Sequence, residues 1–171
     1  MLKLLFFRLG LLMKLDLDKI DVRILQELQQ DSSLTNQDLA DRVGLSPSPC
    51  LRRVKALEES GIIDRKVTLL KRSELGLKLT AYIQISMDRH TPDRFSVFEE
   101  QVNSFPEVRT CNLVTGQNCD YLLEVVVEDM EDYHDFLLGQ LTRIPGVSGV
   151  QSSFLLRSVK ENTSLPLGHL I

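Results

Sequence analysis

The stretch LTNQDLADRVGLSPSPCLRRVKALEESG, residues 34–61, decides the fold of the first part of the chain. Thr35 is a good N-cap for a helix, and that helix ends at Gly44, because glycine adopts a positive φ without steric cost. Ser46 then caps a second helix, with Pro47 at its first position, where no backbone N–H is needed. Two helices joined by a short glycine turn are typical of a helix-turn-helix unit.

A further helix precedes this unit and completes a three-helix head. Asp16 or Asp18 can cap it, and it extends to about Gln30. Its apolar residues recur at the spacing of one helical face: Ile20, Ile24, Leu25 and Leu28. In the helix that begins at Pro47, the same spacing predicts a buried stripe of Cys50, Leu51, Val54 and Leu57.

The start of this last helix supplies the candidate DNA contacts. A B-DNA major groove admits one α-helix, whose N-terminal residues meet the base edges. Arg52 can reach a guanine or a phosphate, whereas Arg53 and Lys55 are expected to contact phosphates, which position without specifying sequence. The structural alternative is a plain three-helix core with a solvated basic side. The full candidate set is Ser46, Ser48, Pro49, Arg52, Arg53 and Lys55.

Composition and charge are compatible with this interpretation. The chain has 171 residues, 43% apolar and 26% charged, which fits one ordinary or two small folded domains. Its net charge is −4, but residues 1–70 hold eleven Lys and Arg against ten Asp and Glu. Three scattered cysteines and three scattered histidines show no zinc-ligand spacing, so we expect no metal site and reduced thiols in a cytoplasmic protein.

Residues 1–13, MLKLLFFRLGLLM, are apolar but too short to span a bilayer, and no small-residue cleavage site follows them. We expect Met13 to be the true start. The expected organisation is an N-terminal extension (1–14), a helix-turn-helix domain (15–64), a strand and linker (65–78), and a second domain with a C-terminal tail (79–171). The strand is predicted at Lys66–Leu70, where it could pair with another copy of the chain.

The second domain alternates strands and helices. Leu79 to Met87 alternates apolar and polar residues, as in a half-buried strand. Further strands are predicted at 108–115, 121–127 and 147–156, and helices from Pro92 to Pro106 and over 130–142. Helical spacing in the second helix predicts a buried stripe of Met130, Tyr133, Phe136, Leu137 and Leu141. The order β-α-β-β-α-β is that of a ferredoxin-like sandwich, so the fold class is α+β: a winged helix-turn-helix followed by this sandwich. The strand at 121–127 is apolar on both faces, which implies a second sheet from an identical subunit.

Residues 17–63 resemble the head of the Lrp/AsnC, or feast/famine, family of transcription regulators. VTGQNCDYLLEV (114–125) and PGVSGVQSSF (145–154) resemble the same family's ligand-binding domain. The resemblance covers about residues 15–167. It implies homodimers formed through the tail sheets, assembly into octamers or similar rings, and an amino-acid effector bound between dimers. It also implies action on double-stranded DNA in the cytoplasm, at the nucleoid, and no membrane.

The resemblance places the effector near the loop 115–120. Asp120 can accept a hydrogen bond from the ammonium of an amino acid, and N–H groups around Gly116 can receive its carboxylate. The alternatives are a turn glycine and an aspartate bonded to its own loop, and Cys119 departs from the residue types expected there. The candidate effector residues are Leu113, Thr115, Gly116, Gln117, Asp120, Met130, Ser152 and Ser153.

These features predict a sequence-specific regulator of genes for amino-acid metabolism or transport, modulated by a small amino acid. The alternative is an oligomeric amino-acid-binding scaffold that does not act through DNA; the basic helix start argues against it. An enzyme is not expected. Acyl-phosphate hydrolysis on a ferredoxin-like domain needs a glycine-rich phosphate cradle before the first helix, and none is present. No cofactor other than the effector is expected.

Overall fold

The computed structural model describes residues 17–116 and 119–170. The N-terminal extension, with its expected start at Met13, and the loop residues Gln117 and Asn118 lie outside this range. The chain divides into two compact units, which we describe separately. The head comprises residues 17–68 together with 160–170, and the tail comprises residues 69–159. The last residues therefore group with the head, whereas the sequence had placed them with the second domain.

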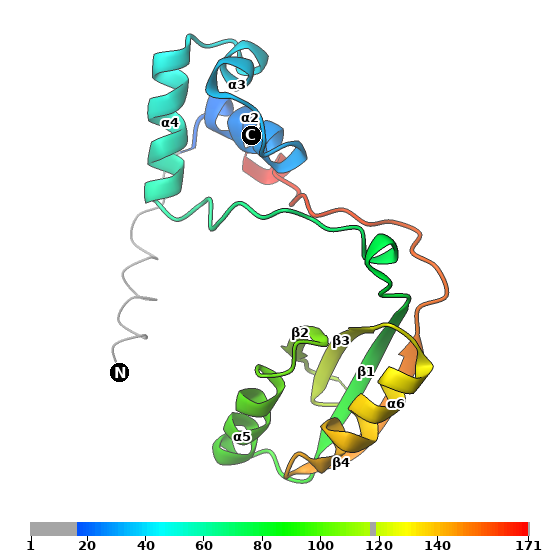
Figure 1. Ribbon diagram of the computed structural model, residues 1–171. Helices are drawn as coiled ribbons and strands as arrows, with labels where there is room; N and C mark the ends of the chain where they lie inside the picture. The colour runs from blue at the N-terminus through cyan, green and yellow to red at the C-terminus, as the bar shows by residue number, and fades with distance from the viewer. Residues whose placement is uncertain (1–16, 117–118, 171) are drawn as a thin grey trace. The chain divides into compact units, whose positions relative to one another are not determined.

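The head contains the three expected helices: α2 (Lys19–Gln30), α3 (Asn36–Val43) and α4 (Pro47–Glu59) (Figure 1). Asp18 caps α2 through a reciprocal capping box with Asp21. Thr35 caps α3 by accepting from the backbone N–H of Asp38, and Gly44 ends that helix with φ of 76°. The described part of the head contains helices and turns but no strand.

Eight buried residues form the core of the head: Ile24, Leu25, Leu39, Ala40, Val43, Cys50, Val54 and Leu57. Leu51 is not among them, since 44% of its surface is exposed. The prediction that Leu51 belongs to the buried stripe is therefore wrong. The stripe of α4 follows Cys50, Val54 and Leu57 at spacings of four and three residues, and Leu51 lies outside this narrow seam.

The C-terminal segment of the chain completes the head. Gln29 of α2 accepts from the backbone N–H of Leu165 at 2.6 Å and donates to its carbonyl at 3.3 Å. The Ser164 hydroxyl donates to the Gln29 carbonyl at 3.4 Å. Leu167 packs against the helical core, just before the short 3₁₀ turn η3 (Gly168–Leu170). We call residues 164–170 the C-terminal strap.

The strand expected at 66–70 does not form in the single chain. Residues 64–71 are irregular, and Val67, Leu69 and Leu70 are largely exposed. A strand needs a hydrogen-bonded neighbour, and the described residues supply none for this segment. The 3₁₀ turn η1 (Arg72–Leu75) then leads into the tail.

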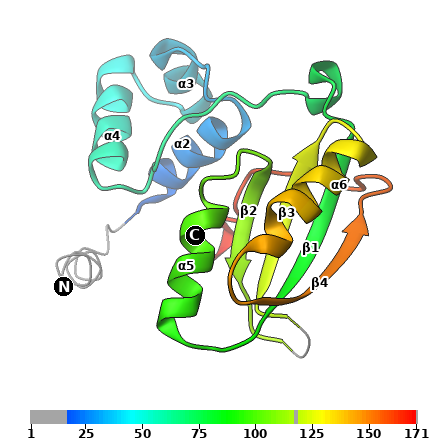
Figure 2. The same cartoon turned by 60° about the horizontal axis from the view of Figure 1, so that its bottom comes forward.

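The tail is the expected β-α-β-β-α-β sandwich. Its elements are β1 (Leu79–Met87), α5 (Pro92–Val102), β2 (Val108–Leu113), β3 (Tyr121–Val127), α6 (Met130–Gly139) and β4 (Val147–Phe154), with the 3₁₀ turn η2 (Leu141–Arg143) after α6. The sheet order is β2-β3-β1-β4, and all neighbouring strands are antiparallel. Helices α5 and α6 lie against one face of the sheet (Figure 2).

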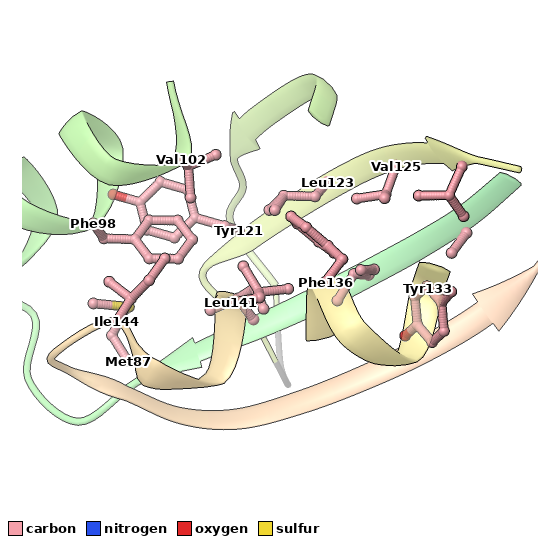
Figure 3. Packing of buried hydrophobic residues seen from close by; sticks show 14 residues of the cluster. Met87, Phe98, Val102, Tyr121, Leu123, Val125, Tyr133, Phe136, Leu141 and Ile144 are labelled. Atoms are coloured by element: carbon pink, nitrogen blue, oxygen red, sulfur yellow. The ribbon is translucent and has the colours of Figure 1, made fainter. Parts of the chain in front are cut away.

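The tail core lies between that sheet face and the two helices. Alternate residues of β1 and β3 point into it, as the twofold repeat of a strand requires. Phe98 and Val102 of α5 meet Tyr121 at one end, and Tyr133 and Phe136 of α6 cover the other (Figure 3). Met130 is 53% exposed, so the prediction that it is buried is wrong. It is the first residue of α6, and the buried stripe begins one turn later at Tyr133.

Candidate DNA-binding and effector sites

Helix α4 presents a polar, basic face to solvent. Ser46, Ser48, Arg52 and Lys55 are exposed, and Pro49 is half-buried. Ser46 stands at the N-cap position, but its hydroxyl makes no capping hydrogen bond. No acidic residue occurs in the first turn of α4, so this end of the helix combines the positive helix dipole with basic side chains. Such a face favours an anionic partner.

Arg53 differs from its neighbours because it is already paired within the head. Its Nη1 lies 2.7 Å from Asp21 Oδ1 and 2.8 Å from Asp18 Oδ2, and one third of its side chain is exposed. The hydrogen bonds to Asp21 and Asp18 raise the pKa of the guanidinium. The backbone N–H of Asp21, together with Arg53, lowers the pKa of Asp18. Arg53 thus ties α4 to the start of α2, and its phosphate contact stays a prediction.

Two further side chains, Asn36 and Arg42, tie the helices of the head together. The Asn36 side-chain amide donates to the Pro47 carbonyl at 2.8 Å, which links the start of α3 to the start of α4. Arg42 of α3 pairs with Glu27 of α2 at 3.1 Å. Neither contact leaves a periodic sequence signal, because each joins a polar side chain to a group on a different helix.

Asp120 is held firmly against the end of β1. Its Oδ2 accepts from the backbone N–H of Met87 at 2.7 Å, and its own N–H donates to the Ile85 carbonyl at 2.7 Å. Its Oδ1 lies 2.8 Å from Nε2 of His90, a side chain outside the predicted effector set. The Asp120 side chain is thus bonded to another strand and to the exposed His90, while its carbonyl accepts from the Val114 N–H at 2.8 Å across the base of its own loop.

The other described candidates in this loop are exposed. Leu113 ends β2 and is 58% exposed, and Thr115 and Gly116 follow it on the surface. A Cβ added at Gly116 would meet no atom within 4 Å, and its φ is not in the left-handed region. The described chain therefore gives no steric reason for glycine at this position. A glycine here would let a group outside the chain come close to the backbone.

The remaining effector candidates lie elsewhere in the tail. Ser152 accepts a hydrogen bond from the Tyr133 hydroxyl, and Ser153 lies opposite Tyr82 in the sheet. Met130 follows the far end of β3 from Asp120, roughly 20 Å along the strand at 3.3 Å per residue. One chain therefore does not bring Met130 together with the loop at 113–120.

A groove of about 440 Å³ opens at the end of the sheet where β2 starts and β3 ends. Its acidic lining residues are Glu107, Glu128, Asp132 and Asp135, beside apolar Leu77, Val126 and Phe136. Glu107 Oε2 is buried without a hydrogen-bond partner. None of the described effector candidates lines this groove, and its carboxylates would repel the carboxylate of a free amino acid.

The described residues contain no cluster of ligands suited to a metal ion, and none of their helices is long and apolar enough to cross a bilayer. Cys50 is buried in the head core as predicted. Burial raises its pKa, and burial with the nearby Glu99 raises the pKa of Cys111 to about 11. Both thiols are therefore protonated near neutral pH.

Comparison with known proteins gives the family. Residues 17–64 match the model of a winged helix-turn-helix DNA-binding domain, and residues 80–165 match that of the Lrp/AsnC ligand binding domain. The chain belongs to the Lrp/AsnC family. It is a DNA-binding transcription regulator with an amino-acid-binding domain, as the sequence predicted.

Named relatives of this Lrp/AsnC protein are regulators. The transcriptional regulator AzlB of Bacillus subtilis is 38% identical over 154 residues, covering 90% of this chain and 98% of the relative. The leucine-responsive regulatory protein of Escherichia coli K12 is 41% identical over 150 residues, covering 88% and 91%. The crystal structure of the regulator NMB0573 of Neisseria meningitidis, in complex with L-Met, has a TM-score of 0.87 at 45% identity, covering 91% of this chain and 99% of that one.

Proposed function

We propose that α4 enters the major groove of operator DNA and that Arg52 reads a base edge or grips a phosphate, with Ser46, Ser48, Pro49 and Lys55 beside it. The exposure of Arg52 on a face free of first-turn acids carries this proposal. Arg53 supports the face by orienting α4 and reaches a phosphate at its edge. The regulated genes serve amino-acid metabolism or transport, and the protein acts on the nucleoid in the cytoplasm.

Arg52→Ala tests the role of α4. Gel shifts across a salt series should show weaker binding and a salt slope lower by about 1 if Arg52 contacts a phosphate. If it contacts a guanine, discrimination at one base pair should fall by about 1–3 kcal/mol instead. Arg157→Ala, at an exposed arginine outside the helices, is the matched control. Unchanged affinity and specificity of the Arg52 variant would reject the proposal.

We further propose that a free amino acid binds at the loop 113–120. Asp120 accepts from its ammonium after His90 moves aside, N–H groups around Gly116 and Gln117 receive its carboxylate, and Leu113 and Thr115 flank it. Because Met130, Ser152 and Ser153 lie far from this loop in one chain, a second copy supplies them. The L-Met bound by the meningococcal relative makes apolar L-amino acids the first ligands to test.

A thermal-shift screen of the twenty amino acids on the full chain tests this site. A ligand that stabilises the wild type should fail to stabilise Asp120→Asn, which keeps an acceptor for Met87 but loses the charge. Each shift is read against the same variant without ligand. If Asp120→Asn responds to the ligand like the wild type, the ammonium does not bind at Asp120.

Assembly is the third part of the proposal. Leu122 and Val126 lie half-buried on the sheet face that α5 and α6 leave uncovered, so we infer that this face packs on the same face of a second chain. Such dimers then assemble into an octamer or a similar ring. Light scattering on Val126→Lys should give monomers, while Val97→Lys, at an exposed valine of α5, should assemble as the wild type does. A Val126→Lys dimer would contradict the proposed face.

A further inference from the structure

Leu51 is an exposed apolar side chain at the edge of the basic face of α4, next to the buried stripe. It is 44% exposed, although the other large apolar residues of this helix, Val54 and Leu57, are buried. It follows Ser48 by three residues and precedes Lys55 by four, so the three side chains share one face of the helix. An isolated surface leucine is ordinary, but this one stands among the groups proposed to meet DNA.

The major groove offers one apolar feature to such a side chain. Thymine presents its C5-methyl group there, whereas cytosine lacks the methyl and presents an N4 amino donor. A leucine against the methyl removes apolar surface from water on both sides. The same leucine against cytosine would cover a donor without providing an acceptor, which is unfavourable.

We propose that Leu51 packs against the C5-methyl of a thymine in each half-site and thereby distinguishes thymine from cytosine at that position. This inference rests on the proposed entry of α4 into the major groove. The charges beside Leu51 favour DNA as its partner. A protein docked on Leu51 would need acidic groups to pair with Arg52 and Lys55, whereas the phosphates on either side of a DNA groove already carry the negative charge that pairs with them.

The test uses the full chain and a duplex that the chain selects from a random-sequence library. Each thymine is replaced in turn by deoxyuridine, which lacks only the methyl group. One thymine per half-site should be sensitive, with binding weakened about fourfold, the effect of one buried methyl-sized group. Leu51→Ala should weaken binding to the unmodified duplex and should show no further loss with deoxyuridine at that position.

Two variants serve as controls. Ile62→Ala removes a head side chain of similar exposure, 40%, beyond the end of α4, and should keep the wild-type discrimination. Far-UV circular dichroism should show Leu51→Ala folded, because Leu51 contributes little to the core. If Leu51→Ala still loses affinity with each deoxyuridine as the wild type does, or if no thymine is sensitive in the wild type, the methyl contact is overturned.

Arg52→Ala separates this failure from a failure of the underlying proposal. If Arg52→Ala weakens binding while Leu51→Ala leaves methyl discrimination intact, α4 is in the groove and the role assigned to Leu51 is wrong. If neither variant changes binding, α4 does not enter the groove, and the inference about Leu51 falls with it.

Discussion

The head and the tail differ in whether the residues proposed to bind a partner also stabilise the fold. In the head, the proposed DNA contacts Ser48, Arg52 and Lys55 lie on one side of α4, and the buried core lies on the other. In the tail, the proposed ammonium acceptor Asp120 also binds the backbone of β1. Changes to the head's binding face should therefore alter function alone, whereas a change at Asp120 should alter both ligand binding and stability.

The largest expected effect tests whether the two units fold on separate cores. Phe98 is fully buried in the tail, with its ring 4.5 Å from that of Tyr121. Phe98→Ala should lower the free energy of unfolding of the tail by about 3–5 kcal/mol. All three tyrosines, Tyr82, Tyr121 and Tyr133, lie in the tail and the chain has no tryptophan, so tyrosine fluorescence in a urea titration reports the tail selectively.

Far-UV circular dichroism of the same sample follows all the helices, of which α2, α3 and α4 of the head contribute the larger share. With Phe98→Ala, the tyrosine transition should move to lower urea while a helical transition persists at the wild-type midpoint. A single transition at the same urea concentration in both signals would show that the two units unfold together. It would contradict the expectation that head and tail fold on separate cores.

The next effect concerns Asp120. Asp120→Ala leaves the buried N–H of Met87 without its acceptor and should cost the tail about 1–3 kcal/mol. Asp120→Asn keeps an oxygen for that N–H and should cost less. Urea titrations of both variants, followed by tyrosine fluorescence, give the two values. If both variants lose a negligible and equal amount of unfolding free energy, Asp120 contributes no more to the stability of the tail than Arg52 is expected to contribute to that of the head.

The corresponding test in the head uses the C-terminal strap. Leu167 is partly buried against the helical core, so Leu167→Ala should lower the stability of the head by about 1–2 kcal/mol, below the range for a fully buried leucine. The loss should appear in circular dichroism and not in tyrosine fluorescence. Leu165→Ala, at an exposed position whose backbone makes the contact to Gln29, is the matched control. A loss confined to the tyrosine signal would show that the strap belongs to the tail.

The contacts of the C-terminal strap are an example of structure that the sequence could not predict. Caps and periodic apolar residues are local signals, and they predicted α3 between Thr35 and Gly44 and β3 over 121–127. The contact between Gln29 and Leu165 joins residues 136 positions apart and leaves no periodic trace. Which of several helically spaced apolar residues are buried depends on the neighbouring elements, and for that reason Leu51 and Met130 were predicted on the wrong side.

The candidate sites show the same division. The helix that carries Arg52 was predictable because a cap, a proline and an apolar stripe fix its orientation. The pairing of Arg53 with Asp18 and Asp21 was not, because it depends on how α4 crosses α2. The effector candidates came from the family resemblance, and their separation along the tail became visible only with the sheet register.

The smallest effect comes from Arg53, the one candidate of α4 that has a role in both binding and folding. The pair with Asp21 is partly exposed, so Arg53→Met should lower the stability of the head by no more than about 1 kcal/mol. The pKa of Asp18 is lowered in the folded head, first by the N–H of Asp21 and then by Arg53. The stabilisation linked to Asp18 is therefore present above its unfolded pKa and is lost as the pH falls through its folded value.

Removing Arg53 removes part of the shift at Asp18, so the variant should lose less head stability than the wild type as the pH falls from 6 to about 3, below the unfolded pKa of an aspartate of about 3.9. Urea titrations by circular dichroism across this range measure the difference, and tyrosine fluorescence of the tail is the internal reference. Equal pH dependence in both proteins would mean that the backbone N–H groups of Asp21 and Ile20, and not Arg53, lower the pKa of Asp18. Arg53 would then be as separable from the fold as Arg52, and its assignment as a phosphate contact would gain support.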